Sequence, residues 1–171
     1  LGAIVYAFDV RPEVAEQIES MGANFVYLEF DASELPDGAA TGGYAAPSSP
    51  AFAAKQLAKF RELAPDMDIV ITTALIPGRP APKLWTAEMV AMMKPGSVIV
   101  DLAAERGGNC ELTVMDQKIV SDNGVTVVGY TDFPSKMAAQ ASTLYATNIR
   151  HMLTDLTPKK DGVIVQNMED D

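Results

Sequence analysis

Short β-branched runs alternate along the chain with stretches of helical periodicity. The runs Ile69–Thr72 and Ser97–Leu102 predict strands, and their continuous apolar character predicts burial on both faces. Phe52–Leu63 predicts a helix, and Thr86–Met93 predicts a shorter helix with Thr86 as its N-cap. Strands that alternate with helices predict an α/β fold of the Rossmann type, with a doubly wound and mostly parallel sheet.

The first thirty residues continue the same alternation. Ala3–Phe8 predicts a strand, Pro12–Met21 a helix that ends at Gly22, and Asn24–Phe30 a second strand. Asp9 follows the first strand directly. A carboxylate in this position either caps the next helix or, in a dinucleotide fold, accepts hydrogen bonds from the adenosine ribose, and the spacing leaves both roles open.

The C-terminal third predicts a hairpin and a long helix. Lys118–Val120 and Val125–Val128 flank an Asp-Asn-Gly turn signal. Lys136–Leu153 predicts a helix with an apolar stripe, and Gly162–Val165 predicts a last short strand. The stripe predicts that its methionines, Met137 and Met152, belong to the core.

Residues 31–50 have no periodicity and are crowded with Gly, Ala, Ser and Pro. A loop of this length inside a compact domain is usually a lid or a linker. Tyr44 behind Gly43 favours a mobile lid that lays a ring over a ligand, and a plain surface loop is the alternative.

Composition narrows the function classes. The chain has 171 residues, 48% of them hydrophobic and 21% charged, which is typical of a folded domain. Thirteen basic residues against 23 acidic ones leave a net charge of −10, which argues against binding of nucleic acid. No apolar run is long enough to insert into a membrane. With one Cys, Cys110, and one His, His151, both a zinc site and a Cys–His nucleophile pair are disfavoured.

Four segments together resemble one known family. They are Ile71–Lys83, Gly96–Cys110, Gly129–Ser135 and Ala141–Asn148. These segments are similar to the NAD(H)-binding domain of proton-translocating NAD(P) transhydrogenase, in its alpha subunit, and alanine dehydrogenase is a more distant relative of the same domain. The resemblance runs over residues 1–171 and implies a partial Rossmann domain. No glycine-rich loop precedes the strand predicted at Ala3–Phe8. We therefore expect that the first strand of the family's domain and its glycine loop are missing from this sequence.

The resemblance implies eight nucleotide-binding positions and no catalytic side chain. They are Asp9, Val10 and Arg11 at the adenosine ribose, Gly43 and Tyr44 in the mobile loop, Gln56 and Leu75 in the pocket lining, and Asp132 near the nicotinamide. Without the resemblance, Gln56 is interpreted as a solvated helix residue. Hydride transfer between two nicotinamides needs positioning rather than an acid or a base, which agrees with the scarcity of His and Cys.

The resemblance also implies cofactors, partners and location. NAD(H) would bind here, and NADP(H) would bind a separate domain of the beta subunit. The alpha subunit would form a homodimer through its NAD domain, in a complex at the cytoplasmic face of the bacterial inner membrane. Two other functions remain open: an amino-acid dehydrogenase of the alanine type, and a nucleotide-binding module without catalysis.

Overall fold

The structure is a computed structural model that describes residues 2–28 and 50–166. The chain divides into two compact units, Leu1–Tyr130 and Thr131–Asp171. The predicted lid, with Gly43 and Tyr44, lies outside the described residues.

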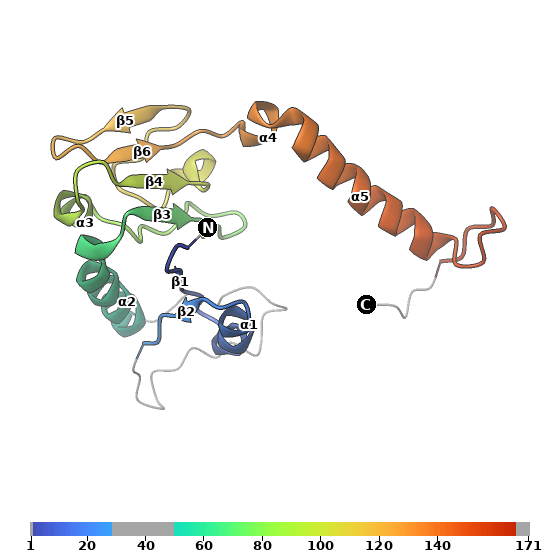
Figure 1. The fold of residues 1–171 in the computed structure, drawn as a ribbon, viewed down its shortest axis with the longest axis horizontal. Helices are drawn as coiled ribbons and strands as arrows, with labels where there is room; N and C mark the ends of the chain where they lie inside the picture. The colour runs from blue at the N-terminus through green and yellow to red at the C-terminus, as the bar shows by residue number, and fades with distance from the viewer. Residues whose placement is uncertain (1, 29–49, 167–171) are drawn as a thin grey trace. The chain divides into compact units, whose positions relative to one another are not determined.

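A four-stranded sheet forms the centre of the first unit (Figure 1). Its strands are β3 (Ile69–Thr72), β4 (Val98–Asp101), β5 (Lys118–Val120) and β6 (Thr126–Val128). Their order is β3-β4-β6-β5, in which β3, β4 and β6 are parallel and β5 is antiparallel at one edge. The mostly parallel α/β sheet and the hairpin predicted from the sequence are therefore both confirmed.

One face of this sheet carries the core. A row of paired residues crosses all four strands, and its members are Val70, Ile99, Val127 and Ile119. Helices α2 (Pro50–Leu63) and α3 (Ala87–Met92) pack on this row through side chains such as Phe60 and Val90. The hydroxyl of Thr86 accepts a hydrogen bond from the N–H of Met89 at 3.3 Å, so the predicted N-cap of α3 is confirmed.

The opposite face of β3 is exposed, in contrast to the burial on both faces that the sequence predicts. Ile69 and Ile71 were predicted to be buried like their neighbours, but they are 66% and 64% exposed. Alternate residues of a strand point to opposite faces of the sheet. Both helices of the core pack on the Val70 face, so within the described residues the continuous apolar run is buried on one side only.

The first residues form a smaller parallel sheet of two strands. These are β1 (Tyr6–Ala7) and β2 (Asn24–Phe25), both shorter than predicted, with the 3-10 turn η1 (Pro12–Val14) and helix α1 (Ala15–Ser20) between them. Gly22 follows α1 with a φ of +81°, the left-handed conformation in which a glycine often ends a helix. The ring of Phe8 meets that of Phe60 on α2 edge-on, with centroids 5.1 Å apart.

The second unit is almost entirely helical, with α4 (Phe133–Lys136) and α5 (Ala138–Leu156) separated at Met137. The predicted core role of Met137 and Met152 is wrong for this chain, since the two side chains are 60% and 49% exposed. No residue of α5 is buried, because no described element of the second unit covers its apolar stripe. The strand predicted at residues 162–165 is also wrong, because the chain there has no ladder partner among the described residues.

Candidate functional site

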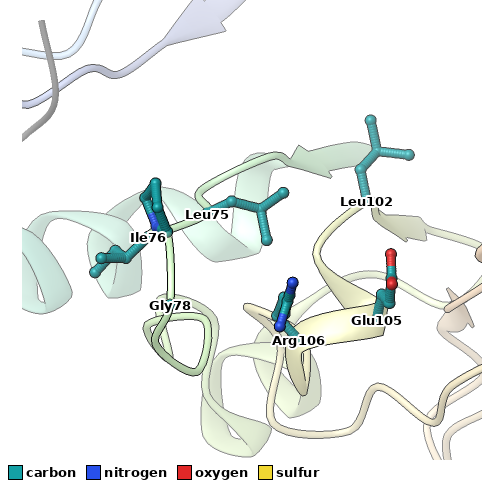
Figure 2. Close-up of a pocket in the computed structure, with 7 residues that line it drawn as sticks. Leu75, Ile76, Gly78, Leu102, Glu105 and Arg106 are labelled. Atoms are coloured by element: carbon teal, nitrogen blue, oxygen red, sulfur yellow. The ribbon is translucent and has the colours of Figure 1, made fainter.

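A pocket of about 360 Å³ opens just beyond the carboxyl ends of β3 and β4. One wall is formed by residues 75–78 of the loop after β3 (residues 73–84, the β3 loop). The other consists of Leu102, Glu105 and Arg106 from the loop after β4 (residues 102–110, the β4 loop), which contains the 3-10 turn η4 (Ala104–Arg106). Figure 2 shows Leu75 and Arg106 on facing walls. Open α/β sheets bind their ligands beyond this edge.

Asn109 joins the two loops through its side chain, although it is completely buried. Its Oδ1 accepts a hydrogen bond from the N–H of Ala74 at 3.0 Å. Its Nδ2 donates to the carbonyl oxygen of Ala74 at 2.9 Å and to that of Pro82 at 2.8 Å. One amide thus holds both ends of the segment that lines the pocket.

Lys83 makes the reciprocal connection, from the β3 loop to the β4 loop. Its ammonium donates to the carbonyl oxygens of Gly107 at 2.6 Å, Gly108 at 2.9 Å and Cys110 at 3.4 Å. A backbone hydrogen bond of 2.8 Å from Ala81 to Arg106 lies between these contacts. We call the two side chains together the Asn109–Lys83 clasp.

The β4 loop is also fixed by the strand that precedes it. Asp101, at the end of β4, is fully buried and accepts hydrogen bonds from the N–H groups of Ala103 and Cys110 at 3.0 and 2.9 Å. The hydroxyl of Thr113 donates a third, at 2.6 Å. At Gly108 a Cβ atom would lie 2.7 Å from Asp101 Oδ2, so only glycine fits there.

Asp9 stands after β1, as the sequence predicts, and it is paired locally. Its carboxylate accepts hydrogen bonds from the backbone N–H, Nε and Nη2 of Arg11, each at 2.9 Å. The hydrogen bond from the Arg11 side chain is the main cause that lowers the pKa of Asp9 below its usual value, while partial burial opposes it. The group is therefore an ionised, half-buried acceptor at neutral pH.

The other predicted site residues fall in three places. Val10 and Arg11 follow Asp9 directly and are half-buried. Gln56 is only 6% exposed on α2, so the interpretation as a solvated residue is wrong. Leu75 lines the pocket. Asp132 belongs to the second unit and pairs with Lys136 at 3.4 Å.

The clasp was not predicted from the sequence, although both segments that contain it were singled out. Neither Asn109 nor Lys83 has a distinctive spacing, because the partners of both are backbone groups 24–35 residues away. The nearest signal was the pair of glycines before Asn109. Glu105 and Arg106 were also not predicted, since a charged pair on a turn is ordinarily a solvated surface.

Other chemistries find little support in the described part of the chain. No group of three metal-ligating side chains is present among these residues, and none of their helices is long and apolar enough to cross a membrane. Cys110 is fully buried, and burial is the main cause that raises the pKa of its thiol. The thiol therefore stays protonated at neutral pH and is a poor nucleophile.

The domain matches a known protein family over its whole length. The family model described as "Alanine dehydrogenase/PNT, C-terminal domain" matches residues 1–171. The chain belongs to this family. A Rossmann-type sheet with a pocket at its carboxyl edge agrees with membership, and the predicted family is confirmed.

Two relatives that match nearly the whole chain are transhydrogenase subunits. "NAD(P) transhydrogenase subunit alpha" of Cereibacter sphaeroides is 85% identical over 171 residues, which is 100% of this chain and 32% of the relative. The protein of the same name from Haemophilus influenzae is 53% identical over 170 residues, or 99% of this chain and 32% of the relative. The chain thus spans about a third of the length of these two relatives.

Solved structures give the same fold. A crystal structure of transhydrogenase from Sinorhizobium meliloti superposes with a TM-score of 0.66 at 41% identity, covering 91% of this chain and 38% of that one. A structure of L-alanine dehydrogenase superposes with a TM-score of 0.63 over 93% of this chain and 38% of that one. At 23% identity, the second shows a shared fold only.

Proposed function

We propose that this chain is the NAD(H)-binding part of a transhydrogenase alpha subunit, which transfers hydride between NADH and NADP⁺ in a reaction coupled to proton translocation. The observation that carries the proposal is the 85% identity with a transhydrogenase alpha subunit over the whole chain. At this identity the pocket walls and the Asp9–Arg11 pair are expected to have the same function in both proteins.

The residues at the end of β1 suit an adenosine ribose. A ribose offers two hydroxyl donors, and the ionised carboxylate of Asp9 is an acceptor. Oδ1 already accepts two hydrogen bonds from Arg11, whereas Oδ2 accepts one, so acceptor capacity remains on Oδ2. The site is therefore compatible with NAD(H), with Val10 and Arg11 beside the ribose.

The pocket at β3 and β4 suits another part of the nucleotide. Leu75 and Leu102 provide apolar surface, and the side chains of Glu105 and Arg106 provide charge of both signs. Neither of these two charged side chains makes an ion pair within the described residues, which leaves them available to a ligand. Gln56, Gly43, Tyr44 and Asp132 complete the proposed set of nucleotide-binding residues.

Bound NADH would supply the hydride, and the residues of this chain would bind and orient it. No proton needs to be moved in direct transfer between nicotinamides, so a site without a reactive thiol is sufficient. The NADP⁺ acceptor would be held by a partner, the beta subunit, and the alpha subunit would be a homodimer. The complex would lie at the inner membrane with its NAD site on the cytoplasmic face.

The proposal is tested with the full-length gene product and its beta partner. NADH deuterated at C4 should reduce an NADP analogue with full transfer of the label. Reduction in deuterated water with unlabelled NADH should place no deuterium at C4 of the product. Solvent deuterium at that carbon would contradict direct transfer, and lack of NADH binding would contradict the proposal as a whole.

The alanine dehydrogenase alternative has weaker support. The alanine dehydrogenase of Bacillus subtilis is 41% identical over 88 residues, which cover 49% of this chain. Reduction of NAD⁺ by alanine, at a rate above that of NADH-dependent reduction of the NADP analogue, would favour this alternative.

A further inference from the structure

The segment that lines the pocket leaves the sheet before it reaches the pocket. Backbone pairing between β3 and β4 ends at Thr72 and Asp101, followed by one hydrogen bond of 2.9 Å from Leu102 N–H to the Thr72 carbonyl. Residues 75–78 lie beyond this point, so the strand ladder does not fix them. Something else must hold the wall in place.

The buried amide of Asn109 closes this segment at its base. Its NH₂ group donates to Ala74 on one side of the pocket wall and to Pro82 on the other. These contacts join the two ends of the loop between residues 74 and 82. Asn109 is fully buried, whereas Ala74 and Pro82 are half-buried, so removal of the amide would break the hydrogen bonds that join the two ends of the loop.

The ammonium of Lys83 holds the opposite wall. Gly107 and Gly108 follow Arg106 directly, and their carbonyl oxygens lie 2.6 and 2.9 Å from Lys83 Nζ. Hydrogen bonds from a charged donor are stronger than neutral ones. The turn that presents Glu105 and Arg106 to the pocket is thereby tied to the β3 loop.

We infer that Asn109 and Lys83 are positioning residues for the nucleotide, which order both walls of the pocket before the ligand arrives. The inference rests on the proposed function and extends it to two side chains that do not line the pocket. Ordering a loop costs conformational entropy. If folding has already ordered the pocket wall, this cost does not reduce the affinity for the ligand. Loss of the clasp should therefore weaken binding even when the domain remains folded.

The decisive variants are Asn109→Asp and Lys83→Met, measured by NADH titration of the full-length gene product. Asn109→Asp keeps the size of the side chain but removes both donated hydrogen bonds, and we expect the Kd for NADH to rise about tenfold or more. Lys83 is exposed, so Lys83→Met tests the clasp without a buried substitution. In Lys83→Met we expect the Kd for NADH to rise about three- to tenfold. In Lys83→Arg, which keeps a charged donor, we expect a much smaller rise.

Lys118→Met is the matched control. It removes the same charge from β5, at the edge of the sheet opposite β3, and should leave the Kd unchanged. Amide hydrogen exchange without nucleotide should accelerate over residues 74–82 in both clasp variants and not in the control.

Three outcomes are distinguishable. If the reference protein does not bind NADH, the proposed function is wrong and the inference falls with it. If the reference protein binds NADH and folded Lys83→Met binds it equally well, the positioning role is overturned, even if exchange over residues 74–82 is faster. If Asn109→Asp does not fold, the result for Lys83→Met and its reversal by Lys83→Arg decide alone.

Discussion

Two carboxylates at strand ends in the first unit show two ways of fixing a polar site. Asp9, after β1, takes its hydrogen bonds from Arg11, two residues away, and remains half-buried. Asp101, at the end of β4, is fully buried and takes its bonds from the N–H groups of Ala103 and Cys110 and from the Thr113 hydroxyl, up to twelve residues away. The first arrangement is local, and the second depends on the folded loop.

The difference has an energetic consequence. A half-exposed ion pair contributes little to stability, because water screens it and competes for both partners. Water cannot replace a lost hydrogen-bond partner of a buried carboxylate, so each lost partner lowers the stability of the fold by the full cost of an unsatisfied buried group. Asp9 can therefore exchange partners at little cost in stability, as the proposed ribose contact requires, whereas Asp101 stabilises the loop that follows β4.

The largest expected effect comes from adding a methyl group inside the buried network. In Gly108→Ala the new Cβ would lie 2.7 Å from Asp101 Oδ2 and from Thr113 Cβ, at a φ of +77°. Crowding and backbone strain together should lower the free energy of unfolding by about 2–5 kcal/mol. Gly107→Ala is the control, because its φ is also positive but no atom lies within 4 Å of its Cβ. Backbone strain alone should cost about 1–2 kcal/mol there. Unfolding free energies are measured by urea denaturation. Equal decreases for the two variants would show that the side chains around Gly108 move aside to accommodate the methyl group.

Asp101→Asn should have the next largest effect on stability. In this variant an amide NH₂ replaces one carboxylate oxygen and faces an N–H group that had donated a hydrogen bond to that oxygen. The free energy of unfolding should therefore fall by about 2–3 kcal/mol. The matched change Asp9→Asn should cost less than about 1 kcal/mol, because that pair is partly screened by solvent. Similar losses for the two variants would remove the distinction between the local and the buried site.

Ligand binding should reverse this ranking. Asp9→Asn should raise the Kd for NADH about tenfold, because a charged acceptor for the ribose hydroxyls is lost. It should also narrow the preference for NADH over NADPH, since a carboxylate repels a 2′-phosphate. Fluorescence titration with both nucleotides measures the ratio. Equal affinity for NADH and NADPH in the unmodified protein would contradict the ribose assignment.

The smallest effect is the pH dependence of the Asp9 pair. Its hydrogen bond from Arg11 lowers the folded-state pKa of Asp9, so the pair stabilises the fold above the unfolded-state pKa. This contribution should be constant near neutral pH and disappear as the pH falls through the lowered pKa, below about pH 4. The difference in unfolding free energy between the reference protein and Asp9→Asn, measured from about pH 7 to about pH 3, should therefore shrink only at the acid end. A difference that grows with acidity would contradict the assigned direction.

Sequence patterns predicted the elements well where local chemistry decides them. The strand at Ile69–Thr72 and the N-cap at Thr86 follow from β-branched runs and capping chemistry, and both are present. Burial was less predictable. Ile71 and Met152 are apolar and correctly placed in their elements, yet both are exposed, because burial requires a second element that the pattern of one segment does not encode.

What the sequence determined by itself is the chemistry that acts over a few residues: the α/β alternation, the hairpin turn, and an acidic residue after β1 with a cation two positions later. What only the tertiary structure decided is which distant groups meet. Asn109 reaches Ala74 across 35 residues, and Lys83 reaches Gly107 across 24. Their partners are backbone atoms, which every residue has. The contact therefore cannot be predicted from the type of residue at position 74 or 107. The pocket edge exists because parallel strands bring two loops together, and no local pattern encodes that proximity.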